Sequence, residues 1–248
     1  MIEYTVEING IHVEATYSDE TVTEIFLPLL NKLTVIQKKK GRRILVMLAA
    51  PPGAGKSTLC SFLEYLSKEH DDIGDIQAIG MDGFHRRQEY LLSHTVFRDG
   101  NELRMVDIKG APITFDLEKL TDAIRMVLSG GDCYWPAYDR HRHNPVENAI
   151  HITEDIVLLE GNYLLLDEEG WCNLREMADY TIRISANEGV LRGRLIDRKK
   201  KSGNDIETAT RFVDFSDMAN VRLCLEKSME ADLMLQMSDN AEYVKTIM

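Results

Sequence analysis

Residues 44–58 read Ile-Leu-Val-Met-Leu-Ala-Ala-Pro-Pro-Gly-Ala-Gly-Lys-Ser-Thr, and this stretch decides the fold class. Residues 44–50 form a continuous apolar run of strand length, and apolar residues recur at helical spacing after Ser57. Residues 50–58 match the P-loop pattern, with Ala50 where a glycine is more usual. Because the motif lies between a predicted strand and a predicted helix, we expect it to bind the phosphates of a nucleotide.

The residue types of this loop suit phosphate binding. Gly53 and Gly55 allow the backbone to curl until several N–H groups point inward, and the following helix adds the positive end of its dipole. We expect Lys56 to reach the β- and γ-phosphates and the Ser57 hydroxyl to bind Mg²⁺. A glycine-rich turn that binds nothing is the alternative, and the agreement of pattern and context argues against it. The predicted nucleotide-binding residues of the loop are Gly53, Ala54, Gly55, Lys56, Ser57 and Thr58.

The nucleotide is predicted to be ATP. GTPases normally also carry an Asn-Lys-x-Asp motif that reads the base. The one Asn-Lys pair in this chain, Asn31-Lys32, precedes the P-loop and lacks the aspartate. ATP and Mg²⁺ are therefore the expected cofactors.

From residue 42 onward, the sequence alternates between strand and helix patterns. Strands are predicted at 44–50, 76–81, 155–159, 180–184 and 231–237, and helices at 57–70, 117–128 and 188–202. This alternation predicts a three-layer α/β P-loop domain with a mostly parallel sheet that is covered on both faces.

Residues 1–41 are predicted to form an N-terminal extension that packs on a kinase domain of residues 42–248. Residues 4–17 alternate between apolar and polar side chains around Asn9-Gly10, which predicts a β-hairpin with a two-residue turn. A helical pattern follows at 22–33, and Pro28 within it should kink or split the helix.

Composition narrows the class of protein. The chain has 248 residues and a net charge of −12, which argues against nucleic acid as the main partner. No apolar run approaches the ~20 residues of a membrane helix, and the N-terminus lacks the apolar segment of a signal peptide. The four cysteines form no Cys-x-x-Cys pair. We therefore expect a reduced, cytoplasmic protein that acts on a small molecule, with neither nucleic acid nor a membrane as its partner.

Two carboxylates follow predicted strands, where doubly wound sheets place their ligands. Asp82 comes after the strand at 76–81, and Glu160 comes after the strand that ends at Leu159. Asp82 could accept the proton of a substrate hydroxyl, hold Mg²⁺ through water, or only shape a turn. An acid at the end of an apolar strand is the Walker B pattern, so Glu160 is the predicted Mg²⁺ ligand together with Ser57.

The order of these motifs resembles the family of phosphoribulokinase, uridine kinase and bacterial-type pantothenate kinase. The resemblance spans residues 44–237 and includes Met81-Asp-Gly-Phe-His85, Lys109-Gly-Ala-Pro112 and Leu159-Glu-Gly-Asn-Tyr163. Two stretches, Leu159-Glu-Gly-Asn-Tyr163 and Ser216-Asp-Met-Ala-Asn220, resemble one branch of this family. That branch is described as nucleoside/nucleotide kinase-like or fructose-transport-system kinase-like. The resemblance implies ATP, Mg²⁺ and Asp82 as the catalytic base.

The resemblance also implies which residues face the phosphate acceptor. Tyr138, Asp139 and His143 lie in residues 136–145, a polar stretch that suits either a loop that reads a polyol or phosphate, or a solvated turn. The other predicted acceptor residues are Phe84, His85 and Asn162.

A basic helix is predicted near residues 188–203, with Arg194, Arg198 and Lys201 on one face. Its place in the family pattern implies a lid that closes over the transferring phosphate. Arg194 is then expected to be catalytic and Arg198 to bind the nucleotide. A solvated charged face is the plainer alternative, and we expect residues 199–201 to be ordinary surface.

These patterns predict an ATP-dependent kinase that phosphorylates a hydroxyl of a small metabolite, such as a sugar, a nucleoside or a vitamin-like alcohol. Asp82, Lys56 and Arg194 are its predicted catalytic residues. The alternative is a nucleotide-binding regulatory ATPase that transfers phosphate only to water, and Asp82 beside an acceptor loop favours the kinase. The sequence leaves the acceptor open, and it leaves the oligomeric state open, including a homodimer.

Overall fold

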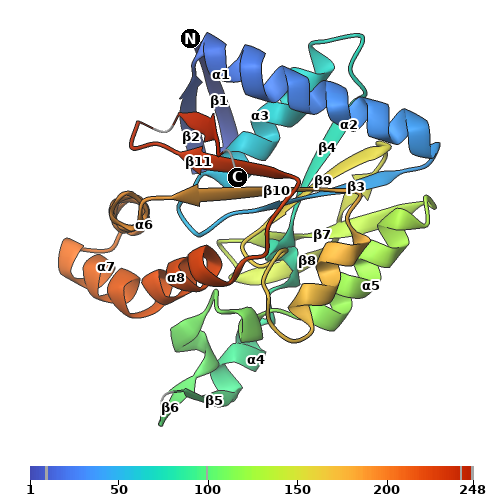
Figure 1. Cartoon of the computed structure of the whole chain (residues 1–248). Helices are drawn as coiled ribbons and strands as arrows, with labels where there is room; N and C mark the ends of the chain where they lie inside the picture. Colours follow the sequence, from blue (N-terminus) through green and yellow to red (C-terminus); the bar gives the residue numbers. More distant parts are fainter. Residues whose placement is uncertain (9–10, 99, 241, 247–248) are drawn as a thin grey trace.

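The structure is a computed structural model that describes residues 1–8, 11–98, 100–240 and 242–246 (Figure 1). Its central sheet has six strands in the order β12-β11-β10-β3-β9-β4. Only β12 pairs antiparallel, at the edge next to β11. The strands are β3 (Ile44–Ala49), β4 (Ile76–Gly80), β9 (Ile156–Gly161), β10 (Tyr180–Ala186), β11 (Leu233–Met237) and β12 (Tyr243–Lys245). The predicted mostly parallel sheet is thus confirmed.

The sheet is the middle of three layers, because alternate residues of its strands enter two separate cores. Leu48 lies in one core with α2 (Leu27–Lys40) and α3 (Lys56–Lys68). Met47 lies in the other core with α5 (Leu117–Leu128). Every residue of β3 and β9 is buried, which explains why these strands read as unbroken apolar runs.

The N-terminal extension lies against α3. The predicted hairpin forms from β1 (Ile2–Ile8) and β2 (Ile11–Tyr17), while its predicted turn at Asn9-Gly10 lies outside the described residues. The Tyr4 hydroxyl is 2.8 Å from the Ser61 hydroxyl of α3, and the Tyr17 ring stacks on Phe62 with centroids 4.2 Å apart. The division of the chain into an extension of residues 1–41 and a kinase domain of residues 42–248 stays a prediction.

The first helix contains the irregularity that Pro28 predicts. A turn of α1 (Asp19–Thr21) leads into a π-helical turn, η1 (Val22–Phe26), before α2 begins. Proline has no N–H for the regular ladder, and the wider turn ahead of it accommodates this loss. The helix is thus irregular next to the proline, but it continues without a break, so the predicted split is absent.

A β-hairpin and a group of helices lie outside the central sheet. A β-hairpin of β7 (Cys133–Asp139) and β8 (Asn144–Ile152) occupies the stretch in which sequence patterns predicted only a polar loop, so just residues 140–143 are its turn. The basic helix is α6 (Glu188–Lys201), followed by α7 (Ile206–Phe212), the π-turn η6 (Val213–Asp217) and α8 (Met218–Lys227). Figure 1 shows α7 and α8 beside α6, below the sheet.

Smaller elements complete the fold. They are η2 (Met81–Phe84), α4 (Gln88–Ser93), β5 (Thr95–Arg98), β6 (Asn101–Arg104), η3 (Met105–Ile108), η4 (Pro112–Thr114) and η5 (Trp171–Met177). Asp116 is the N-cap of α5, because its carboxylate accepts a hydrogen bond from the Lys119 amide. Within the described residues, the structure has no helix with the length and apolar character that a membrane crossing requires.

Candidate active site

The P-loop connects β3 to α3 and is shaped by two glycines. Gly53 and Gly55 have φ angles of 86° and 78°, in the left-handed region that favours glycine. A Cβ atom at Gly53 would lie 3.2 Å from the Leu191 carbonyl oxygen, so the loop also packs closely on α6. Gly55 is the N-cap of α3, and the first N–H groups of this helix lack intrahelical partners and are suited to bind phosphate.

Ser57 and Glu160 meet where α3 begins and β9 ends. The Ser57 hydroxyl donates a hydrogen bond of 2.6 Å to Glu160 Oε1. Glu160 pairs with Gly80 of β4 in the sheet, and a Cβ atom at Gly80 would lie 3.2 Å from the same carboxylate oxygen. A hydroxyl and a carboxylate at this edge are oxygen ligands of the kind that Mg²⁺ prefers.

Asp82 lies in η2, directly after β4, and close to several cationic groups. Desolvation opposes its ionisation, but its side chain is 40% exposed, so this penalty is partial. The His85 ring when it is protonated, and the charges of Lys56, Arg140 and Arg198, outweigh it and lower the pKa of Asp82. The residue is therefore a carboxylate at neutral pH.

The pKa of Glu160 is shifted in the opposite direction, upward. Desolvation raises the pKa of Glu160, and the negative charge of Asp82 raises it further, against the opposing charge of Lys56. Two carboxylates that share one small region cannot both ionise without cost, and a cation between them relieves that repulsion. The pair therefore has the electrostatic character of a cation-binding site.

A cavity of about 240 Å³ lies beside these two carboxylates. Ser57, Asp82, Glu160 and Tyr138 line it, and Ile8 of the N-terminal hairpin lies at its border. Gly83 also lines it, and a Cβ atom there would lie only 2.2 Å from the Pro136 carbonyl oxygen. The β7–β8 hairpin is thus held directly against the segment that carries Asp82.

His85 is held between that segment and two aromatic rings. Its ring centroid is 4.0 Å from that of Phe115 and 5.0 Å from that of Tyr138. Its Nδ1 lies 2.9 Å from the carbonyl oxygen of Asp82. Desolvation lowers the pKa of His85, so the ring is neutral at pH 7. It therefore orients the segment through packing and one hydrogen bond.

The other predicted acceptor residues of the β7–β8 hairpin shape its turn. Asp139 Oδ1 accepts hydrogen bonds from the amides of His141 and Arg142, at 2.8 and 3.0 Å. His143 is exposed, with a φ angle of 53°, and its carbonyl oxygen accepts a hydrogen bond from Lys109. Of the predicted acceptor residues Tyr138, Asp139 and His143, only Tyr138 lines the cavity beside Asp82.

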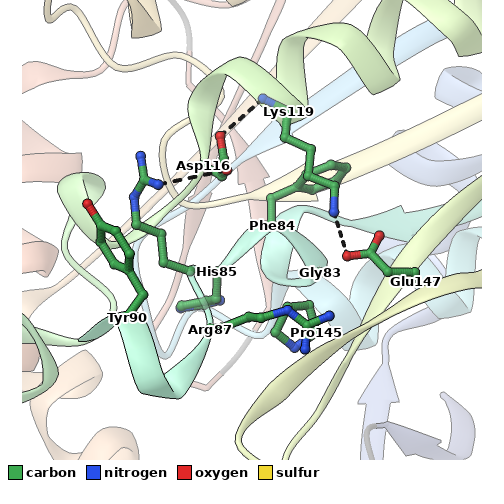
Figure 2. Close-up of a pocket in the computed structure, with 10 residues that line it drawn as sticks. Gly83, Phe84, His85, Arg87, Tyr90, Asp116, Lys119, Pro145 and Glu147 are labelled. Carbon is green, nitrogen blue, oxygen red and sulfur yellow. Dashed lines mark hydrogen bonds and ion pairs between the residues drawn. The ribbon is translucent and has the colours of Figure 1, made fainter. Parts of the chain in front are cut away.

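Figure 2 shows a second hollow, next to residues 83–90. Two ion pairs lie in its lining, Arg86 with Asp116 at 3.8 Å and Lys119 with Glu147 at 2.5 Å. Phe84, a predicted acceptor residue, lies on this side; it is 1% exposed and packs edge-on against Trp135. The full lining is Gly83, Phe84, His85, Arg86, Arg87, Tyr90, Asp116, Lys119, Pro145 and Glu147, which shares only Gly83 with the lining of the first cavity.

The basic helix α6 lies over the P-loop. Arg194 Nη1 is 3.4 Å from the Gly53 carbonyl oxygen, which places a guanidinium at the loop itself. Arg198, one turn later, lies within electrostatic range of Asp82. Lys199 was expected to be ordinary surface, but its Nζ lies 3.5 Å from the centroid of the Phe212 ring, and it lies within electrostatic range of Asp217. The end of α6 is therefore part of the site's surroundings.

The family pattern of the phosphoribulokinase and uridine kinase family matches residues 45–242, which is most of the chain. The chain belongs to this family.

Similar proteins and a solved structure agree with this assignment. The chain is 42% identical to the uncharacterized protein YggC of Escherichia coli over 243 residues, covering 98% of each chain. It is 28% identical to a uridine kinase of Clostridium novyi over 174 residues, covering 70% of this chain and 73% of that one. A crystal structure from Silicibacter sp., titled a "putative fructose transport system kinase", superposes with a TM-score of 0.73 at 29% identity, covering 84% and 98% of the two chains.

For a kinase of this family, the structure adds one residue that the sequence patterns did not single out. Arg140 lies next to Asp139 in the hairpin turn, and its Nε is buried without a hydrogen-bond partner among the described residues. Its charge acts on Asp82, Glu160 and Arg198. The only sequence signal for Arg140 was its place in the polar stretch of residues 136–145, which contains several other basic residues.

Asn162, the last predicted acceptor residue, follows β9. Its backbone carbonyl oxygen accepts a hydrogen bond from the Cys224 thiol of α8, and its side-chain Oδ1 is buried without a partner among the described residues. The structure therefore brings most of the predicted residues to one edge of the sheet, while Phe84, Asp139 and His143 lie around it.

Proposed function

We propose that this chain is an ATP-dependent kinase that transfers the γ-phosphate of ATP to a hydroxyl of a small metabolite. The observation that carries this proposal is the position of Asp82. It is an ionised carboxylate that lines a cavity together with Ser57 of the P-loop and Glu160 of β9. A protein that only hydrolyses ATP has no need of a lined cavity next to its base.

The residues around the cavity suit an in-line transfer. The acceptor oxygen forms a bond to the γ-phosphorus, the bond between that phosphorus and the β,γ-bridging oxygen breaks, and ADP leaves. Asp82 accepts the proton of the acceptor hydroxyl. Lys56 and Arg194, which lie at the P-loop, stabilise the charge of the transferring group.

Ser57 and Glu160 fit a magnesium ion, because both offer oxygen ligands and lie 2.6 Å apart at the loop that binds phosphate. When bound, Mg²⁺ would neutralise part of the charge on the phosphate oxygens. The raised pKa of Glu160 supports the same role, since a nearby cation would favour its ionised form.

The test is phosphate transfer from γ-labelled ATP to a panel of sugars, polyols, nucleosides and vitamin-like alcohols. We expect label to move to at least one compound, and we expect Asp82→Asn to remove that transfer while nucleotide binding persists. Release of free phosphate alone, at a rate that no compound changes, would instead support a regulatory ATPase.

A further inference from the structure

The inner face of β1 leads along α3 to the cavity beside Asp82. Side chains alternate along a strand, and Tyr4 and Ile8 belong to the half-buried face of β1. The Tyr4 hydroxyl is 2.8 Å from that of Ser61, and Ser61 and Ile8 both line the cavity. Figure 1 shows β1 beside α3. The N-terminal hairpin therefore forms part of the cavity wall as well as a cover for the helix.

Ile8 is an apolar side chain that the two cores of the protein leave unused. Ile2 and Tyr4, on the same face of β1, pack against the core that contains α3. Ile8 is not among the described residues that form either core or pack against one, and it is only half-buried. Aliphatic surface gains free energy when it leaves water, so a compound in the cavity that covered Ile8 would be held there by it.

Aromatic contacts fix the hairpin on the helix that follows the P-loop. The Tyr4 ring lies edge-on to that of Phe62 at 5.2 Å, and Tyr17 of β2 stacks on the same Phe62 ring at 4.2 Å. Phe62 belongs to α3, whose Ser57 lines the cavity. Because the hairpin and the P-loop are attached to one helix, Ile8 holds a set position relative to the phosphate-binding residues.

The lining of the cavity combines two chemistries. Ser57, Asp82 and Glu160 are its polar residues next to the P-loop, whereas the two hairpins contribute the aliphatic side chains of Ile8 and Ile150. The cavity volume of about 240 Å³ lies somewhat below the roughly 300–1,000 Å³ of pockets for drug-sized compounds. One small compound that fills the cavity therefore meets the carboxylates and the aliphatic side chains together.

We propose that Ile8 is a specificity-determining residue, which holds an apolar part of the acceptor while the acceptor hydroxyl faces Asp82. The acceptor is then a small alcohol that carries an apolar ring or alkyl arm, and a fully polar compound such as glycerol is a poor one. The family pattern matches residues 45–242, so this contact comes from a part of the chain ahead of the matched residues. The inference rests on the proposed kinase function, since it needs a hydroxyl compound in the cavity.

The test measures transfer from γ-labelled ATP to pyridoxine, pantothenol, uridine, D-ribose and glycerol. For the best acceptor, kcat and KM are compared among the unmodified protein, Ile8→Ala and the matched control Val6→Ala. Val6 lies on the same face of β1 but does not line the cavity. We expect Ile8→Ala to raise the acceptor KM about 10-fold or more, the scale of methylene groups removed from an apolar pocket. The KM for ATP should stay within about 2-fold, and Val6→Ala should change neither value.

Further substitutions of Ile8 separate a lost contact from a loosened fold. Ile8→Val removes less of the side chain and should give a smaller rise in KM than Ile8→Ala. Ile8→Trp should fill the cavity and block transfer, while slow hydrolysis of ATP by water persists. If Ile8→Ala lowers the melting temperature, the choice among acceptors still decides. A loosened fold lowers transfer to every compound alike, whereas a lost contact narrows the preference for the best acceptor over glycerol.

The outcomes separate the two proposals. Transfer to an acceptor whose KM is unchanged in Ile8→Ala would overturn the role of Ile8 and leave the kinase standing. Equal effects of Ile8→Ala and Val6→Ala, or glycerol or D-ribose as the best acceptor, would do the same. ATP hydrolysis without transfer to any compound of the panel would overturn both.

Discussion

Ser57 Oγ donates a 2.6 Å hydrogen bond to Glu160 Oε1, which joins the first turn of α3 to the end of β9. If both oxygens hold Mg²⁺, Glu160→Gln should weaken metal binding without removing the base. We expect transfer to fall at low Mg²⁺ and to recover in part as Mg²⁺ is raised. A magnesium titration of the transfer rate measures this. A rate that stays equally low at every Mg²⁺ concentration would contradict the metal role.

Asp82→Asn should behave differently from Glu160→Gln. Asparagine keeps the shape of the side chain but accepts no proton, so we expect transfer to fall by ~10²-fold or more while ATP affinity is nearly unchanged. Extra Mg²⁺ should not help. Because the pKa of Asp82 is lowered, the unmodified enzyme should keep this base ionised from neutral pH down to about pH 4, and activity should fall only below that. Normal turnover of Asp82→Asn across pH would remove Asp82 from the mechanism.

Lys56→Ala should abolish phosphoryl transfer and leave the fold intact. Lys56 begins α3 at the P-loop and is only half-buried, so its truncation leaves no cavity in the core. Transfer assays and thermal melting measure the two effects. Turnover within about tenfold of the unmodified protein would argue decisively against the P-loop assignment.

Asp179 should make stability depend on pH. Burial opposes its ionisation, but hydrogen bonds from Arg42, Lys40 and the Leu45 amide outweigh it and lower the pKa of Asp179. A lowered folded-state pKa gives a contribution that is complete above the unfolded value of about 4 and is lost as pH falls through the folded value. We expect Asp179→Asn to cost about 1–3 kcal/mol at pH 7.

The difference between Asp179→Asn and the unmodified protein should shrink below about pH 4, where the aspartate itself becomes protonated. Denaturant unfolding at several pH values measures it. Asp122→Asn is the control, because its pair with Arg125 is exposed on both sides and should contribute about 0–1 kcal/mol. A loss for Asp179→Asn that is equal at pH 7 and at acid pH would contradict the assignment.

Tyr17→Ala should show whether the N-terminal extension belongs to the core. Tyr17 is 4% exposed and stacks on Phe62, so its truncation should cost about 3–5 kcal/mol, as for other buried aromatic residues. Phe97→Ala, at an exposed aromatic position of β5, is the control. Melting should remain a single transition in both variants. A separate early transition would indicate that residues 1–41 unfold on their own.

Much of the fold follows from local sequence patterns. Strands β3 and β9 are recognisable because both of their faces are buried, so β3 is apolar throughout and β9 is apolar up to Glu160. The P-loop is recognisable because its glycines and Lys56 occupy fixed positions between a strand and a helix. The β7–β8 hairpin was missed because β8 has mostly exposed residues and gives no alternating signal.

The sequence by itself determined the fold class, the P-loop and the two carboxylates, because each depends on residues that are neighbours along the chain. Only the tertiary structure decided which distant groups share a space. The charge of Arg140 acts on Asp82 because a hairpin packs on Gly83, and the charge of Arg198 acts on Asp217, which a π-turn buries. Such contacts depend on how separate elements pack and on the desolvation that follows, and no local pattern in the chain encodes either of these.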